Sequence, residues 1–141
     1  MLKRVLALDV GDKRIGIAVS DPMGITANGL ETYTRKDPQS DAQYIIDMAK
    51  GYAPVELLFG MPRNMNGTYG PQSEKVKDFA NLIASQYDGE ISFYDERMTT
   101  MQAERVLIDA DMSRQKRRKV IDKVAAVVIL QSYLANQSSQ R

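Results

Sequence analysis

The sequence contains no cysteine and no histidine. Without cysteine the chain can form neither a disulfide nor a thiolate metal site, which suits a reducing compartment. Without histidine there is no imidazole to act as a general base, as a zinc ligand or as part of a serine–histidine–aspartate triad. If the protein is an enzyme, its chemistry must therefore use carboxylates, hydroxyls, amines, backbone dipoles or a hard metal ion bound by oxygen.

Long apolar runs are also missing. The longest covers residues 124–130, far short of the roughly 20 apolar residues that a membrane-spanning helix needs. The apolar N-terminal stretch stops at Asp9 without a cleavage site of small residues after it, which argues against a signal peptide. Hydrophobic residues make up 43% and charged residues 26% of the chain, as is typical of folded globular proteins. We therefore expect one cytoplasmic domain over residues 1–141, with no membrane partner.

What the sequence does contain is the succession of strands and helices that is typical of an α/β protein. Three short strands come first and can pair as a meander through tight turns, and each later strand follows a helix, which predicts a mixed sheet flanked by helices. The expected strands cover residues 4–9, 15–20, 30–34, 55–60 and 91–96. The expected helices cover residues 38–51, 71–86, 99–109 and 117–135.

Acidic residues are expected at one edge of this sheet. Asp9 ends the first strand after four consecutive apolar residues, and Asp95-Glu96 ends the fifth. Asp122 belongs to the apolar side of the last helix, because the residues three, four and seven positions after it are alanine, alanine and isoleucine. Carboxylates that gather repel one another unless a cation joins them, and oxygen ligands favour Mg²⁺ or Mn²⁺. Pairs of such ions hydrolyse phosphodiester bonds without histidine.

Each acid also has a simpler explanation. Asp9 could cap a turn through nearby amides. Glu96 could form a surface ion pair with Arg97, and Asp122 could pair with a neighbouring lysine. The metal-site hypothesis rests on the convergence of the three acids at one edge rather than on any of them alone.

Positive charge is concentrated around Asp122. The net charge is +1, yet residues 114–123 carry six basic residues and one acid, which leaves −4 for the rest of the chain. Basic residues in the first turn of a helix oppose its dipole, so this run is either a solvated face or a contact for phosphates. The candidate contacts in the run are Arg114, Lys116, Arg117 and Arg118. The loop stretch RNMNGT offers Arg63 and Asn64 for the same purpose, although its Asn-Gly pair could be only a turn.

Four stretches of the sequence resemble one known family. "LALDVGDKRIGIAVSD", "GMPRNMNGT", "YDERMTT" and "IDKVAAVVILQSYL" occur in the order found in the YqgF/RuvX family, described as pre-16S rRNA nucleases and earlier as Holliday junction resolvases. The resemblance extends over essentially the whole chain. It implies a single ribonuclease H-like nuclease domain, built on a five-stranded mixed sheet whose second strand is antiparallel to the others and which helices flank.

The resemblance also implies roles for individual residues. The acids of the family's D-x-G, D-E-R and D-x-x-A-A motifs correspond to Asp9, Glu96 and Asp122, which would bind one or two Mg²⁺ or Mn²⁺ ions to activate a water and steady the leaving oxygen. Arg97 and Arg63 could stabilise charge on the phosphate. The implied protein is a metal-dependent hydrolase, a nuclease that processes the 5′ end of pre-16S rRNA in ribosome biogenesis.

Other functions remain open at this stage. The substrate could be branched DNA, as for a Holliday junction resolvase, and a symmetric resolvase would require a homodimer rather than a monomer. The chain could also be a nucleic-acid-binding module that keeps the fold without catalysis. The D-x-G stretch resembles the first phosphate loop of actin-like ATPases as well, but 141 residues cannot supply the two subdomains that those enzymes need.

Overall fold

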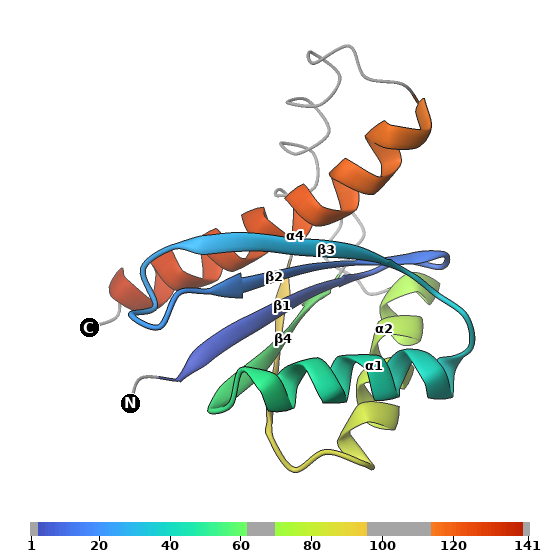
Figure 1. Cartoon of the computed structure of the whole chain (residues 1–141), viewed down its shortest axis with the longest axis horizontal. Helices are drawn as coiled ribbons and strands as arrows, with labels where there is room; N and C mark the ends of the chain where they lie inside the picture. The colour runs from blue at the N-terminus through green and yellow to red at the C-terminus, as the bar shows by residue number, and fades with distance from the viewer. Residues whose placement is uncertain (1–2, 62–69, 96–113, 140–141) are drawn as a thin grey trace.

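The computed structural model describes residues 3–61, 70–95 and 114–139, with side chains in the last range described for residues 123–135 (Figure 1). The strands of this part form one five-stranded sheet in the order β3-β2-β1-β4-β5. They are β1 (Arg4–Val10), β2 (Arg14–Ser20), β3 (Ala27–Thr34), β4 (Val55–Met61) and β5 (Glu90–Asp95). β2 runs antiparallel to both of its neighbours, whereas the pairs β1–β4 and β4–β5 are parallel. The predicted mixed sheet with an antiparallel second strand is confirmed.

Helices cover both faces of the sheet. In Figure 1, α1 (Pro38–Gly51) and α2 (Pro71–Ala84) lie against one face, and α4 (Arg114–Ser139) lies across the other. α1 begins as predicted, with the Asp37 side chain accepting a hydrogen bond from the Ser40 amide at 2.8 Å and Pro38 in the first turn. None of the helices that the structure describes is long and apolar enough to cross a membrane.

α4 is longer at both ends than the sequence pattern predicted. It begins at residue 114 rather than 117 and ends at residue 139 rather than 135. Arginine, glutamine and lysine are strong helix formers, so the basic run propagates the helix even though its charges oppose the helix dipole. The short helix expected over residues 99–109 lies outside the described residues.

β3 also starts earlier than predicted, at Ala27 instead of residue 30, because β2 pairs with it as far as Ser20 opposite Ala27. The sequence of this segment contains Gly29, which favours a turn when read alone. In the structure α4 crosses here. A Cβ atom added at Gly29 would lie 3.0 Å from Cγ of Lys123 and 3.4 Å from Cγ2 of Val127. Gly29 therefore lets α4 approach the sheet closely.

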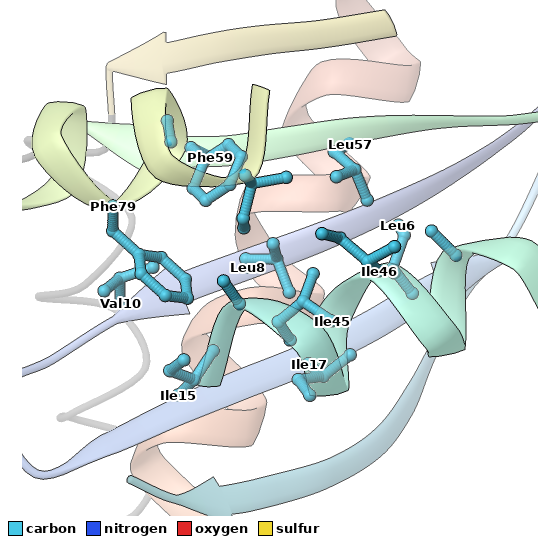
Figure 2. Packing of buried hydrophobic residues seen from close by; sticks show 14 of the residues in the cluster. Leu6, Leu8, Val10, Ile15, Ile17, Ile45, Ile46, Leu57, Phe59 and Phe79 are labelled. Atoms are coloured by element: carbon cyan, nitrogen blue, oxygen red, sulfur yellow. The ribbon is translucent and has the colours of Figure 1, made fainter. Parts of the chain in front are cut away.

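The core consists of two apolar layers that share the central strand β1. Leu6, Leu8 and Val10 point into the larger layer, under α1 and α2, where Figure 2 shows them beside apolar residues of those helices. Val5 and Ala7 point into the smaller layer, under α4. The predicted burial of β1 on both faces is confirmed. The predicted stripes of α1 and α2 are buried as well, at Ala42, Ile45, Ile46, Ala49, Val76, Phe79, Ala80 and Ile83.

A buried carboxylate joins α4 to the sheet near the amino end of the parallel strands. Glu56 of β4 is only 2% exposed and accepts a hydrogen bond from the Tyr133 hydroxyl of α4 at 2.6 Å. The Lys3 ammonium lies 3.6 Å from the same carboxylate. Burial, together with this hydrogen bond to a carboxylate, raises the pKa of Tyr133 to about 12. The hydroxyl therefore stays protonated and keeps donating to Glu56 at neutral pH.

Replacing Tyr133 by phenylalanine should destabilise the fold, because the buried Glu56 carboxylate loses a donor. A hydrogen bond to a charged group contributes about 1.5–3 kcal/mol, so thermal unfolding should show a melting temperature roughly 4–8 °C lower. The matched control is Tyr52→Phe, since the Tyr52 hydroxyl makes no hydrogen bond within the described residues. Equal melting temperatures for the two variants would contradict the assigned bond.

The raised pKa of Tyr133 also predicts how the difference in stability between the parent and Tyr133→Phe changes with pH. A tyrosine whose pKa is raised in the folded state contributes stability that is present below its ordinary pKa of 10 and is lost as the pH rises towards about 12. The gap in unfolding free energy between the parent and Tyr133→Phe should therefore narrow between pH 10 and pH 12. Denaturant titrations at pH 8, 10 and about 11.5 measure it, and a gap that widens with pH would refute the assignment.

Candidate active site

Asp9 occupies the carboxyl end of the central strand. It is the last but one residue of β1 and is half-buried, directly after the four buried apolar residues. Because side chains alternate along a strand, Asp9 lies on the face of Val5 and Ala7, which is the face that α4 covers. The acid predicted from the sequence to end this strand is thus held at the sheet edge and on the side of α4.

Two glycines flank Asp9 in the sheet. Gly16 of β2 is its partner in the antiparallel register. On the other side, Leu8 pairs with Phe59, so the next residue along β4 beside Asp9 is Gly60. Neither neighbouring strand therefore carries a side chain at the position directly beside Asp9, and glycine within strands often marks a close approach of a ligand. The sequence analysis missed both residues, although each is an isolated glycine in a strand pattern.

The pleat of β5 distinguishes between the two acids at its end. Phe93 contacts the ring of Phe59 on the side of α1 and α2, whereas Tyr94 packs with the residues under α4. Asp95 follows Tyr94 and therefore lies on the face opposite to Asp9. Of the pair Asp95-Glu96, the aspartate is thus separated from Asp9 by the sheet. Glu96 lies outside the described residues.

The other predicted site residues lie wholly or partly outside the described part. Arg63, Asn64 and Arg97 are outside it. Asp122 and the basic residues Arg114, Lys116, Arg117 and Arg118 belong to α4 by their backbone, while their side chains are not described. The residues that follow Asp122 at helical spacings, Ala125, Ala126 and Ile129, are buried, as expected for that side of the helix. Within the described residues, no three acidic side chains gather as a metal site would need.

Hydrogen bonds from several elements hold the turn that follows Asp9. The Gly11 amide donates to the Arg14 carbonyl at 2.8 Å and closes the β1–β2 hairpin. Arg35, just after β3, donates to the Gly11 carbonyl from Nη1 at 2.9 Å and to the Lys13 carbonyl from its backbone amide at 2.9 Å. From α2, Gln72 donates to the Val10 carbonyl at 3.2 Å. The end of β1 is therefore fixed from three directions.

A buried ion pair holds Arg35 itself. Its Nε lies 2.9 Å from Oδ2 of Asp41, which is 1% exposed, and its guanidinium stacks over the Phe79 ring at 4.9 Å. Asp41 also accepts hydrogen bonds from the Tyr33 hydroxyl and from the Lys36 amide, both at 2.9 Å. The sequence analysis missed this network, because an aspartate in the first turn of a helix is the expected dipole partner at a surface.

Chemically, the described part of the edge supplies the Asp9 carboxylate on the face that α4 covers, at the end of a strand whose backbone is held in place. Its oxygens are the donors that a hard divalent cation prefers. Asp9 is half-buried, and the glycines at positions 16 and 60 place no side chain directly beside it in the sheet.

Comparisons with known proteins agree with one another. A family profile described as "RuvX: Holliday junction resolvase" matches residues 3–136. A protein from Halothermothrix orenii is 48% identical over 135 residues, which cover 96% of this chain and 96% of that protein, and it is named "Putative pre-16S rRNA nuclease". A protein from Clostridium botulinum with the same name is 50% identical over 135 residues, or 96% of this chain and 98% of that protein.

Solved structures share the fold at much lower sequence identity. The structure titled "T. thermophilus RuvC in complex with Holliday junction substrate" superposes with a TM-score of 0.60 at 13% identity, covering 97% of each chain. A Fowlpox virus resolvase, solved with Holliday junction DNA, gives a TM-score of 0.60 at 12% identity and covers 95% of this chain and 98% of that one. At these identities the likeness establishes the fold, which is that of ribonuclease H-like resolvases.

The hairpin beside Asp9 should not tolerate a side chain at Gly11. A Cβ atom there would lie 3.0 Å from the Arg14 carbonyl oxygen, which already accepts the Gly11 amide. Because backbone must move, Gly11→Ala should destabilise the fold by about 1–2 kcal/mol, or roughly 3–7 °C in melting temperature.

Gly51→Ala is the matched control, since a Cβ at this last residue of α1 meets nothing within 4 Å. It should leave the stability unchanged or raise it by about 0.4–1 kcal/mol. Calorimetry of the two variants tests the contrast, and a Gly11→Ala protein as stable as Gly51→Ala would disprove the constraint on the hairpin.

Proposed function

The chain belongs to the RuvX family, described as Holliday junction resolvases, and from this premise we propose that it is a metal-dependent nuclease that hydrolyses phosphodiester bonds in structured nucleic acid. The names of its close relatives and its family support a nuclease. The observation that carries the proposal is Asp9, a carboxylate at the carboxyl end of a doubly buried strand with glycine on both sides. Ligand sites of α/β sheets lie at this edge.

The available donors fit a hard metal ion. We assign Asp9, Glu96 and Asp122 as the ligands of one or two Mg²⁺ or Mn²⁺ ions, because all three offer oxygen and the chain has no cysteine or histidine to bind a softer metal. The alternation of β5 supports Glu96 over Asp95, since Asp95 lies on the wrong face. Such ions, when bound, lower the pKa of an attacking water and stabilise a leaving oxygen.

The protein's own residues would position the substrate and balance its charge. Arg63 and Arg97 are proposed to stabilise negative charge on the phosphate during displacement, and Asn64 to bind the nucleic acid beside them. Arg114, Lys116, Arg117 and Arg118 are proposed to hold the substrate backbone, because a run of basic residues next to the acids suits phosphates. Asp9, fixed by the hairpin, would keep its oxygens in place without reorganisation.

For the substrate, we favour the precursor of 16S rRNA in the cytoplasm, trimmed at its 5′ end, because the relatives at 48% and 50% identity carry that name. Branched DNA is the second candidate, favoured by the family description and by the resolvase fold. The test is cleavage of a 16S rRNA precursor and a four-way DNA junction side by side, with Mg²⁺ or Mn²⁺. A junction resolvase should act as a homodimer, whereas a trimming nuclease can act as a monomer. Cleavage of neither substrate would leave a non-catalytic binding module.

Neutralising Asp9 should show whether its carboxylate is a metal ligand or the cap of a turn. If three carboxylates converge, the metal-free Asp9→Asn protein loses a repulsion and should melt higher than the metal-free parent, by a few degrees or about 1 kcal/mol. Mg²⁺ should stabilise the parent by mass action and the variant much less, and cleavage should vanish. A turn cap predicts instead a loss of about 0.5–2 kcal/mol that is independent of metal.

Asp95→Asn is the control for this experiment. It removes the same charge from the carboxyl end of β5, a parallel strand separated from β1 by β4, and on the opposite face of the sheet. Its stabilisation by Mg²⁺ should equal that of the parent. A reduced metal response in Asp95→Asn, or an intact one in Asp9→Asn, would reject the assigned ligands.

The basic run at the start of α4 should contribute to affinity rather than to sequence recognition. Changing Lys116, Arg117 and Arg118 to glutamine should flatten the slope of log K against log salt by about two to three, since each phosphate contact contributes a slope near 0.9 for duplex DNA and 0.7 for single strands. Binding titrations at several salt concentrations measure this slope. An unchanged slope would place the run on a solvated face.

A further inference from the structure

A basic hollow lies at the carboxyl edge of the sheet, between the tip of the β1–β2 hairpin and the segment that joins β3 to α1. Its volume is about 530 Å³. Four cationic side chains line it: Lys13 and Arg14 from the hairpin, and Arg35 and Lys36 from the segment after β3. We call these four residues and the space between them the hairpin hollow.

The carboxylates that also line the hollow are engaged elsewhere. Asp12 pairs with Lys75 of α2 at 3.1 Å, and Asp37 caps α1, whose amide and hydroxyl donors at Ser40 hold the pKa of Asp37 below its ordinary value. Asp41 is buried and carries the Arg35 ion pair. Each acid therefore already has a partner within the protein.

Two of the cations form no ion pair within the part of the chain that the structure describes. Lys13 and Lys36 are exposed and make no salt bridge there, although the charge of Lys36 helps to lower the pKa of the neighbouring Asp37. Two lysines that line one hollow repel each other, and an anion between them would relieve that repulsion. Their backbone is nevertheless fixed, since Arg35 binds the Lys13 carbonyl and Asp41 accepts the Lys36 amide. The hollow thus presents two exposed positive charges on a rigid frame.

The position of the hollow relates it to Asp9. The β1–β2 hairpin begins two residues after Asp9, and β3 runs parallel to β1, so both sides of the hollow lie at the same carboxyl edge of the sheet (Figure 1). Arg14 pairs with Thr34 and lies on the face of Gly16 and therefore of Asp9. A nucleic acid that passes Asp9 and continues along this edge towards β3 and the start of α1 would meet the hollow.

We propose that the hairpin hollow binds a phosphate of the substrate backbone, a few nucleotides from the one that is cleaved, and so fixes the direction in which nucleic acid crosses the active edge. This assignment rests on the proposed nuclease function and extends it to Lys13 and Lys36. The contact is to phosphate, so it should be independent of sequence. Lys13 and Lys36 act as positioning residues.

The test compares an exposed lysine that lines the hollow with an exposed lysine that lies away from it. Lys36→Gln and Lys50→Gln each remove one exposed lysine near an end of α1, and Lys50 lies at the end distant from the hollow. Binding of a labelled RNA duplex and of a four-way DNA junction is titrated over a range of salt concentrations, with EDTA present to prevent cleavage. Lys36→Gln should weaken binding and flatten the salt slope by about 0.7–0.9, and Lys13→Gln/Lys36→Gln by about 1.4–1.8. Lys50→Gln should match the parent.

Cleavage with Mg²⁺ separates this inference from the proposed function. For the double variant the loss should fall on KM more than on kcat, because the phosphate is remote from the reacting one. If the parent cleaves but the double variant keeps the parental salt slope, the hollow is not a phosphate site while the nuclease function stands. If the slope depends on Lys13 and Lys36 but the parent cleaves neither substrate, the hollow stands and the nuclease function fails. A parent that binds neither probe overturns both.

Discussion

The burial of β1 on both faces is the constraint from which the remaining structure follows. A strand with apolar side chains in both directions needs a layer on each side, and here α1 and α2 supply one layer and α4 the other. Polar groups are then excluded from the middle of the sheet and appear only near its ends. Glu56 lies near the amino end of the parallel strands and Asp9 at the carboxyl end. The candidate site is therefore at the edge because no other position near the centre of the sheet admits a charge.

The carboxylates at the amino and carboxyl ends of the parallel strands have different surroundings. At the amino end, Tyr133 and Lys3 satisfy the buried Glu56, so that the carboxylate serves to attach α4. At the carboxyl end, the Arg35–Asp41 pair holds the hairpin from the α1 side of the sheet. Asp9 lies on the opposite face, which α4 covers. Buried charge pairs are weak sources of stability but hold a specific geometry where both partners are satisfied. The Arg35–Asp41 pair therefore contributes to the position of Asp9 by holding the hairpin rigid.

The fold could be predicted largely from local patterns, because β1 contains a continuous apolar run, β4 is mostly apolar, and α1 and α2 carry clear apolar stripes. The predicted start of β3 was wrong by three residues. The structure shows that Gly29 belongs to the strand, where it lets α4 pack closely against the sheet. For the site, the location of Asp9 followed from the length of the apolar run. That Asp95 lies on the face opposite to Asp9 could be seen only from the observed alternation of side chains along β5. The role of Arg35 depends on a contact between distant segments, which a periodic sequence pattern does not reveal. Contacts between segments that are distant in the sequence are the hardest feature to predict from a single sequence.

The parallel pairing of β1 with β4 has a further consequence for how the chain reaches its fold. β1 pairs with β2 across a short hairpin, but its other edge waits for β4, whose Leu57 lies opposite Leu6. During synthesis the N-terminal meander can form early, while the central strand β1 keeps one edge open until α1 and β4 have left the ribosome. Non-local pairings of this kind slow folding and expose strands to aggregation in the meantime. Truncation after α1 should therefore yield an insoluble fragment rather than a smaller folded protein, and the nascent chain would depend on a holding chaperone over that interval.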